Sequence, residues 1–259
     1  MKSKKTTGNP NLINPHLDGD AFFWAAGSTG ILLSHGFTAT TAEIRPMAKI
    51  FHAQGYTVAA PLLPGHGTQP EDLNHVHWQD WVAAGQKSLE KLFESCEQVW
   101  VAGESMGGVL ALYLASQFPK ISGILLYAPA IRLTLSKVDL VKLYIGSPFI
   151  SEVPRDSLDG SDEWQGYAGL PLKGSIQLLR FQAATRKRFA KIHQPTLIFQ
   201  GRKDLTVAPE AGEMILNGIS SAVKEHHWMK NSSHAIVLDA EREEVAQLSM
   251  QFIERMTGV

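Results

Sequence analysis

The stretch Val101-Ala-Gly-Glu-Ser-Met-Gly-Gly108 decides the fold, because it contains the pattern Gly-x-Ser-x-Gly centred on Ser105. The run before it is rich in β-branched and aromatic residues, and the run after it, Val109–Ala115, is typical of a buried helix. In this strand–turn–helix context the motif predicts a nucleophile elbow, which holds a serine at the tip of a sharp turn. Gly103 and Gly107 leave room for the strand and the helix to approach each other. An ordinary glycine-rich turn is the alternative interpretation.

Length and composition are typical of one large α/β domain. The chain has 259 residues, of which 44% are hydrophobic and 19% charged, so it can bury a sizeable core. The formal net charge of -1 provides no basic field for binding nucleic acid, and no nucleic-acid partner is expected. The single cysteine, Cys96, cannot form an internal disulfide, and we interpret it as an ordinary residue at a helix end.

The first residues of the sequence indicate neither a signal peptide nor a membrane anchor. They are polar and basic, but no apolar h-region follows them, and no apolar run approaches the length of a membrane span. We therefore expect residues 1–19 to form a mobile N-terminal tail. With no sign of another compartment, the expected location is cytoplasmic.

From residue 20 onward, short β-rich runs alternate with amphipathic helices, which predicts a mostly parallel central sheet with helices on both faces. Residues 21–34 indicate an opening hairpin that feeds a buried strand. The run Thr40-Thr-Ala-Glu43 has the pattern of a capping box and predicts the start of a helix. Further strands are expected near residues 56–60, 121–127, 195–199 and 223–228, and further helices near residues 78–94 and 240–256.

The alternation of strands and helices breaks down between Pro129 and Ile192. An insertion between two strands that carries its own apolar residues predicts a small cap over the catalytic end of the sheet. A helical excursion that merely packs on the core is the alternative. We therefore divide the chain into a core, residues 20–130 and 192–259, and a cap insertion, residues 131–191.

Two late loops supply partners for the serine of the elbow. Serine is a poor nucleophile near neutral pH, so it needs a base that takes its proton and an acid that orients the base. On an elbow of this kind the partners follow in the order serine, acid, histidine. Asp204 comes just after a predicted strand, where catalytic groups gather in open α/β sheets. His234 lies in a loop after the next strand, so we predict a triad of Ser105, Asp204 and His234.

Other acids and histidines fit these roles less well. Asp204 could instead be a turn or helix-capping residue, and Asp239 competes as the acid, although its position suits the N-cap of the last helix. His226 and His227 fall within a predicted strand, and His193 lies where the cap returns to the core. None of these three histidines occupies a loop after a late strand.

An oxyanion hole needs two backbone N–H groups directed at the carbonyl oxygen on which negative charge develops. One is expected from Met106, directly after the nucleophile, and the other from Phe37, in the loop after an early strand. Gly36 permits the tight turn that exposes the Phe37 amide, and His35 is expected to brace this loop through hydrogen bonds. We expect the side chains of Phe37 and Met106 to line the acyl pocket.

The remaining histidine motifs have simpler interpretations. Pro64-Gly-His66-Gly67 fits a tight βα turn better than a substrate contact. His75 and His77 lie two positions apart without cysteine or carboxylate partners, so no metal site is expected.

Five segments together resemble the bacterial carboxylesterase/monoacylglycerol lipase family of α/β-hydrolases, from about residue 20 to the C-terminus. They are Leu33-Ser-His-Gly-Phe-Thr, Pro61-Leu-Leu-Pro-Gly-His-Gly67, Gly103-Glu-Ser-Met-Gly-Gly108, Gln200-Gly-Arg-Lys-Asp204 and the loop that contains His234. The resemblance is strong over these motifs and weak over the cap. It implies the same triad and oxyanion hole, a small cap, activity on short- to medium-chain acyl esters or monoacylglycerols, and no cofactor. The sequence departs from the family at Ser233, where glycine is usual; we expect this to be tolerated, because the loop needs no positive φ there.

The sequence therefore predicts a serine hydrolase that transfers an acyl group to water through an acyl-serine intermediate. We expect a small acyl ester to contact Gly36, Phe37 and Met106 in the core, and Leu135 and Ile145 in the cap. The same triad also serves thioesterases, acyltransferases, small-amide hydrolases and C–C hydrolases, and a hydrolase-fold protein can bind a ligand without catalysis. Transient contact of the apolar cap with a lipid surface is a further alternative. The sequence is compatible with either a monomer or a dimer.

Overall fold

The computed structural model describes residues 9–154 and 162–258. Within these ranges the central sheet has seven strands in the order β11-β10-β6-β5-β3-β4-β2. Neighbouring strands run parallel except β2, which lies antiparallel to β4 at one edge. The predicted mostly parallel sheet is therefore confirmed. In chain order the strands are β2 (Phe22–Trp24), β3 (Thr29–Ser34), β4 (Thr57–Ala60), β5 (Gln98–Glu104), β6 (Gly123–Tyr127), β10 (Thr196–Gly201) and β11 (Lys224–Met229).

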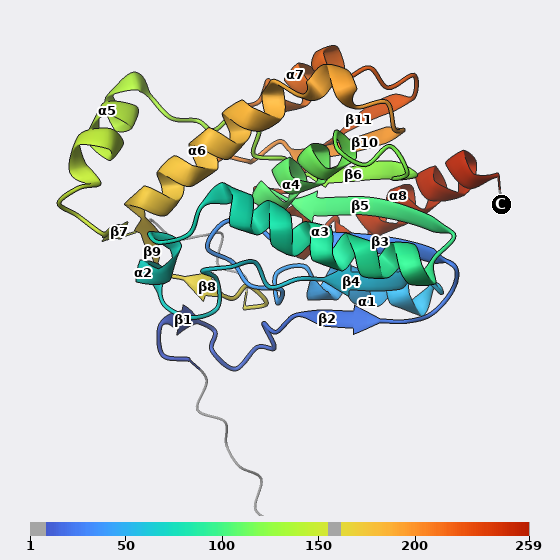
Figure 1. Ribbon diagram of the computed structural model, residues 1–259, viewed down its shortest axis with the longest axis horizontal. Coiled ribbons are helices and arrows are strands. Elements are labelled where there is room, and N and C mark those ends of the chain that lie inside the picture. Colours follow the sequence, from blue (N-terminus) through green and yellow to red (C-terminus); the bar gives the residue numbers. More distant parts are fainter. Residues whose placement is uncertain (1–8, 155–161, 259) are drawn as a thin grey trace, which may run out of the picture.

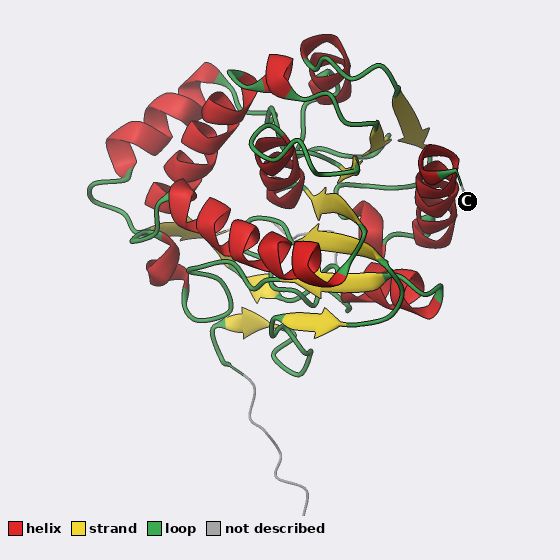
Figure 2. Cartoon of the chain, turned by 45° about the vertical axis from the view of Figure 1, so that its right-hand side comes forward, coloured by secondary structure: helices red, strands yellow, loops and turns green. Residues whose placement is uncertain are grey.

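Helices cover both faces of this sheet, as predicted (Figure 1, Figure 2). One face packs against α1 and α8, and the other against α3, α4 and α7, while α6 packs on α3 and α4. Their bounds are α1 (Arg45–Ala53), α3 (Trp78–Ser95), α4 (Met106–Ala115), α6 (Leu172–Arg186), α7 (Ala211–Gly218) and α8 (Arg242–Thr257). The short 3₁₀ helix η2 (Ile236–Leu238) precedes α8.

The core follows from the alternation of side chains along the strands. Along β3, Ile31 and Leu33 point into the cluster that contains α1 and α8, whereas Leu32 points into the cluster on the opposite face. All three are almost completely buried. Helix α4 is buried over its whole length, because it fills the centre of the second layer directly behind β5. The elbow at its start is thus held between two buried elements.

The opening strand does not form the expected hairpin. β2 pairs with β4 and not with β3, so residues 21–34 cross to the far side of β4. The connection is held there because Thr57 accepts the N–H of Ala26 and donates its hydroxyl to the carbonyl of Gly27. These partners lie some thirty residues away, which the local pattern of a hairpin does not reveal.

The segment 131–191 lies between β6 and β10 and has its own small elements. Helix α5 (Lys137–Gly146) packs on α6 and otherwise lies at the edge of the molecule (Figure 1). Two strand pairs accompany it: β7 (Glu152–Pro154) with β9 (Gly169–Pro171), and β8 (Gly166–Tyr167) with β1 (Leu12–Ile13). The 3₁₀ helix η1 (Phe189–Lys191) leads back to the sheet, and α2 (Pro70–Leu73) of the core contacts β9.

The expected mobile tail differs from the structure over part of its length. Residues 1–8 lie outside the described residues, but residues 9–19 pack against both the inserted segment and the core, where Asn11 donates to the carbonyl of Thr68 and Asp18 pairs with Arg45. Leu12 and Ile13 pair with β8, and the Asn14 side chain donates to the carbonyl of Trp164. The expectation is therefore wrong for residues 9–19, because their partners come from far along the chain.

Two expected helix caps are also wrong. Helix α1 begins at Arg45 after Ile44, so Glu43 lies outside the helix and its carboxylate binds other groups. Helix α8 begins at Arg242 after Glu241, and Asp239 instead accepts hydrogen bonds from the loop before it. In both cases a side chain that could cap a helix is used by a more distant loop.

Candidate active site

Ser105 occupies the strained turn that the motif predicts. It has φ +53° and ψ -113°, an unusual conformation for a residue other than glycine, which costs of the order of 1–3 kcal/mol. The glycines around it are required by close packing. A Cβ on Gly103 would lie 2.1 Å from the backbone of Gly107, and a Cβ on Gly107 would lie 2.1 Å from the carbonyl oxygen of Ser34. The tight backbone turn at the end of β5 therefore places the hydroxyl of Ser105 at its tip.

The three predicted triad residues lie in one hydrogen-bonded row. The Nε2 atom of His234 lies 2.9 Å from Ser105 Oγ, and its Nδ1 atom lies 2.9 Å from Asp204 Oδ2. Ser105 follows β5, Asp204 follows β10, and His234 follows β11, so parallel strands bring all three to one edge of the sheet. The arrangement gives a nucleophile, a base within reach of its proton, and an acid that orients the base.

The carboxylate of Asp204 is fixed and ionised. Its second oxygen, Oδ1, accepts the backbone N–H groups of Thr206 and Val207 at 2.8 and 3.0 Å. Burial alone raises the pKa of Asp204, but the hydrogen bond from His234 and these two N–H groups outweigh it and leave the pKa below its ordinary value. Asp204 is therefore a negative charge at neutral pH and can stabilise a protonated His234.

A second carboxyl group, that of Glu104, is buried beside the site. Glu104, directly before the nucleophile, is 1% exposed. Burial, followed by the nearby charges of Glu43 and Asp204, raises the pKa of Glu104 well above its ordinary value. Burial thus raises the pKa of Glu104, whereas hydrogen bonds keep the pKa of Asp204, the acid that faces His234, below its ordinary value.

The loop that carries His234 is held by acids in the segment before α8. Ser233 donates both its backbone N–H and its hydroxyl to Asp239, and the Ser232 hydroxyl donates to Glu241. Ser233 has no positive φ, as expected from the sequence, so serine fits this position without backbone strain. Its hydroxyl adds a hydrogen bond that glycine could not make.

The expected oxyanion loop lies beside the elbow. Ser34, the last residue of β3, is opposite Gly103 in the sheet, and a Cβ on Gly36 would lie 3.4 Å from the Cβ of Ser105. His35 braces the loop as expected: its Nε2 accepts the N–H of Leu63 at 3.1 Å, which leaves Nδ1 to donate to the carbonyl of Gly36 at 2.9 Å. This carbonyl belongs to the same peptide unit as the N–H of Phe37.

Burial of His35 predicts a loss of stability in acid. An unfolded histidine has a pKa of about 6.5, whereas burial lowers the pKa of His35 to about 4 despite its bond to Gly36. Between these values the unfolded chain takes up a proton that the folded chain does not, so stability falls as the pH drops from about 6.5 to 4. For His35 the full interval corresponds to about 3 kcal/mol. Urea unfolding at several pH values measures this slope.

Two histidine variants separate this contribution from the titration of carboxylates. His35→Asn should show a shallower fall in the free energy of unfolding over the same interval. His16→Asn, at an exposed site, should keep the slope of the unmodified protein. Equal slopes in both variants would contradict the assignment to His35.

A cavity of about 1140 Å³ opens above the nucleophile and separates the core from the segment 131–191. Ser105, His234, Gly36 and Phe37 line it from the core. The inserted segment contributes mainly apolar side chains: Leu133, Leu135, Val141, Leu143, Ile145, Ile150, Val153, Leu170, Leu172 and Leu178. The predicted contacts Leu135 and Ile145 are thus part of the lining.

The side chain of Met106 is not part of this lining. It is completely buried in the core cluster beneath the sheet, so the expectation that it lines the acyl pocket is wrong. The first residue of a helix that starts beneath an elbow directs its side chain inward, whereas its backbone N–H lies in the first turn and is available to a ligand. The backbone position of Met106 remains suited to an oxyanion hole.

Sequence reasoning missed several residues at the cavity. Lys203, Leu205 and Thr206 line it because they flank Asp204 in the loop after β10. Their position next to a predicted catalytic residue, just after a strand, is a signal from which these three residues could have been predicted. Glu43 and Trp164 also line it, but no local signal marks them, since their contacts join residues more than a hundred positions apart.

The other histidine motifs have structural roles. Gly65 and Gly67 have φ values of +80° and +75°, so the segment around His66 forms a tight turn. His77 caps α3, and His75 lies beside Glu71 on the surface. Residues 9–154 and 162–258 contain no group of three or more His, Cys, Asp or Glu side chains placed to hold a metal ion. No helix in these ranges has the length and apolar character needed to cross a bilayer.

Comparison with known proteins gives consistent matches over nearly the whole chain. Residues 31–248 match the model of the alpha/beta hydrolase family. A thermostable monoacylglycerol lipase of Bacillus sp. (strain H-257) is 36% identical over 94% of this chain and 98% of its own length. A carboxylesterase of Bacillus subtilis (strain 168) is 30% identical over 91% of this chain and 96% of its own. The solved structure of a metagenome-derived lipolytic enzyme has a TM-score of 0.87 and 32% identity, covering 96% of this chain and 99% of that one.

Proposed function

The chain belongs to the alpha/beta hydrolase family and hydrolyses carboxylic esters, and we propose that Ser105, His234 and Asp204 carry out this reaction. The observation that carries the proposal is the row of two 2.9 Å contacts from Asp204 through His234 to the hydroxyl of Ser105, at the floor of a large cavity. Such a row has the contacts that acyl transfer through a serine requires.

The first half of the reaction forms an acyl-serine. Ser105 Oγ attacks the ester carbonyl carbon while its proton passes to His234 Nε2, and Asp204 stabilises the resulting imidazolium. The backbone N–H groups of Phe37 and Met106 bind the negative charge on the carbonyl oxygen. When the tetrahedral intermediate collapses, the carbon–oxygen bond to the alcohol breaks and His234 gives its proton to the leaving alkoxide.

The second half releases the acid. A water molecule attacks the acyl-serine carbonyl, and His234 removes the proton of the water as it does so. The same two N–H groups hold the second oxyanion. The intermediate then expels Ser105, which regains its proton from His234, and a carboxylic acid leaves the cavity.

The lining of the cavity supports acyl esters with an apolar chain, including monoacylglycerols, as substrates. The volume of about 1140 Å³ is slightly above the usual range of about 300–1,000 Å³ for small-molecule pockets, and the segment 131–191 supplies an apolar wall opposite Ser105. The names of the two Bacillus relatives support the same substrate class. We propose that residues 131–191 form the cap over residues 20–130 and 192–259.

A substrate series tests this function. With p-nitrophenyl esters of increasing acyl length, kcat/KM should rise from acetate to medium chains, because burial of each added methylene contributes about 0.8 kcal/mol. The matched anilide and thioester should be turned over more slowly than the ester. A preference for the thioester, or no turnover of any ester despite tight binding, would contradict ester hydrolysis as the function.

We also propose that the cap contacts a lipid surface. Large apolar side chains of this segment are exposed, with Phe149 87% and Ile145 65% exposed, and Val138, Val141 and Tyr144 lie near them on α5. An exposed apolar group of this kind is typical of an interaction site. Assays with a monoacylglycerol below and above its critical micellar concentration test this contact. If the cap binds a lipid surface, the rate should rise more steeply with substrate concentration once micelles are present.

Two further proposals concern the state of the protein. All three triad residues come from one chain, so a monomer is sufficient for the reaction and a dimer is not required. Cys96 is buried and free, which is compatible with the reducing conditions of the cytoplasm.

A further inference from the structure

Glu43 joins the oxyanion loop to the cap. It lies in the turn before α1 and is 5% exposed. Its Oε2 accepts the backbone N–H of Gly36 at 2.6 Å, and its Oε1 accepts the indole N–H of Trp164 at 3.1 Å. Trp164 is also 5% exposed and belongs to the inserted segment. One buried carboxyl group thus holds a donor from the core and a donor from the inserted segment, and both residues line the cavity.

The contact with Gly36 fixes the peptide that matters for catalysis. Glu43 holds the N–H of Gly36, and His35 holds the carbonyl of Gly36 from the other side. The direction of the next N–H, that of Phe37, follows from this carbonyl because the peptide unit is planar. Hydrogen bonds to a carboxylate are short and strong, so Glu43 is well suited to hold a backbone that must not shift.

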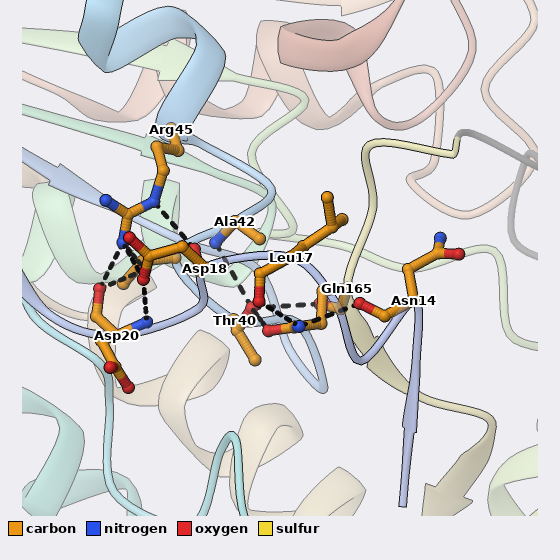
Figure 3. A network of polar contacts seen from close by, with 9 residues as sticks. Asn14, Leu17, Asp18, Asp20, Thr40, Ala42, Arg45 and Gln165 are labelled. Carbon is orange, nitrogen blue, oxygen red and sulfur yellow. Dashed lines mark hydrogen bonds and ion pairs between the residues drawn. The ribbon is translucent and has the colours of Figure 1, made fainter. Parts of the chain in front are cut away.

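The contact with Trp164 is supported by its surroundings. Two residues that follow the Gly36–Phe37 peptide pair with the strip formed by residues 164–167: the N–H of Tyr167 donates to the carbonyl of Thr38, and the N–H of Thr40 donates to the carbonyl of Gln165. The Gln165 amide also donates to the carbonyls of Asn14 and Leu17, which straps the N-terminal segment over the same strip (Figure 3). Trp164 is therefore held in place beside Glu43 and can transmit the position of the cap.

We propose that Glu43 is a positioning residue: it orients the Gly36–Phe37 peptide for the oxyanion and makes this orientation depend on Trp164 of the cap. The proposal rests on the proposed function, because it assigns the N–H of Phe37 to the oxyanion hole. Glu43 takes no part in the proton transfers. Its effect is expected on the rate of acyl transfer and much less on the binding of the ester.

The chemistry of the carboxyl group supplies a sharp test. The carboxylate of Glu43 offers one oxygen to the N–H of Gly36 and the other to the indole N–H of Trp164, whereas a glutamine amide offers one oxygen and one NH₂ group. With the side chain in the same position, Glu43→Gln therefore sets its NH₂ group against either Gly36 or Trp164 and loses that hydrogen bond. When Trp164→Phe removes the indole donor as well, the N–H of Gly36 no longer competes with the indole N–H for the single amide oxygen of the substituted side chain. The double variant Glu43→Gln/Trp164→Phe can therefore hold Gly36 again.

Steady-state kinetics on a soluble p-nitrophenyl ester should show this pattern. Loss of an oxyanion-hole donor lowers kcat by about 10²–10³, so misalignment in Glu43→Gln should lower kcat by at least about tenfold. KM should change by less than about threefold, since binding of the ground state does not use the oxyanion. The double variant should recover to within about threefold of Trp164→Phe alone. Affinity for a trifluoromethyl ketone, which mimics the oxyanion, should follow kcat.

Matched controls separate positioning from loss of structure. Glu225→Gln removes a carboxylate of β11 that pairs with Arg255 of α8. Trp24→Phe alters a half-buried indole on β2. Both should keep the kcat of the unmodified protein. Thermal unfolding of every variant shows whether it is folded. If Glu43→Gln does not fold, Trp164→Phe still tests the proposal, because this variant should lower kcat although Glu43 is in place.

Three outcomes would overturn the inference: an unchanged kcat in Glu43→Gln, an effect on KM alone, or losses that simply multiply in the double variant. A Ser105→Ala variant assayed in parallel distinguishes this failure from failure of the proposed function. If Ser105→Ala is inactive and Glu43→Gln is fully active, only the positioning role is wrong. If Ser105→Ala is active, the assignment of the nucleophile is wrong.

Discussion

Replacing Ser105 by alanine should lower kcat for a soluble ester by about 10⁶, the loss seen when the nucleophile of a subtilisin triad is removed. The hydroxyl is the atom that forms the covalent intermediate, and neither His234 nor Asp204 can replace it. The change removes one oxygen from a side chain that is 8% exposed, so no cavity of consequence forms. Folding should be preserved, because alanine can occupy the same turn.

The measurement is initial rate with a p-nitrophenyl ester, together with thermal unfolding. Ser95→Ala, an exposed serine at the end of α3, is the matched control and should keep full activity. Substitution at Ser105 should lower the unfolding temperature only slightly, since the strain at the elbow stays and the hydrogen bond to His234 Nε2 is lost at the edge of the cavity. Retention of most activity by Ser105→Ala would show that another residue is the nucleophile.

Replacing Asp204 by asparagine should lower kcat by about 10⁴, as the equivalent change does in a trypsin-like triad. The asparagine NH₂ group can donate to Nδ1 of His234, which favours the tautomer with its proton on Nε2. That tautomer cannot accept the proton of Ser105. The negative charge that stabilises the protonated imidazole is lost as well, and the ordinary backbone contacts of Asp204 Oδ1 can persist.

The rival acid provides the control for this variant. Asp239 is the alternative acid from the sequence, but it binds Ser233 rather than His234. Asp239→Asn should therefore lower kcat far less than Asp204→Asn, by loosening the loop that carries the histidine. The reverse order of effects would contradict the assignment of Asp204.

The parts of the fold that were predictable are those with a local signal. The elbow is encoded within eight residues by glycine spacing and by the change from a strand-like to a helix-like pattern. Asp204 and His234 were predictable because parallel strands bring their carboxyl ends to one edge, so residues after successive strands meet. The role of these three side chains in catalysis remains a prediction that the kinetic experiments test.

The errors at the N-terminal segment, at β2 and at Glu43 share one physical cause, which is the choice of a partner far along the chain. β2 follows the pattern of a hairpin strand, yet it pairs with β4. Glu43 has the spacing of a capping residue, yet it binds Gly36 and Trp164. A short polar or β-rich segment determines which kinds of group it can pair with. The tertiary fold determines which of several suitable groups lies beside that segment.

The central claim is that the ester is cleaved through a covalent bond to Ser105, and one labelling experiment tests it most directly. The protein is treated with a fluorophosphonate until esterase activity is lost, and the intact mass and the modified peptide are then determined. We expect one adduct per chain, on the peptide that contains Ser105, formed in step with the loss of activity. Adduct formation at another residue, or full esterase activity in a chain labelled at Ser105, would contradict the account.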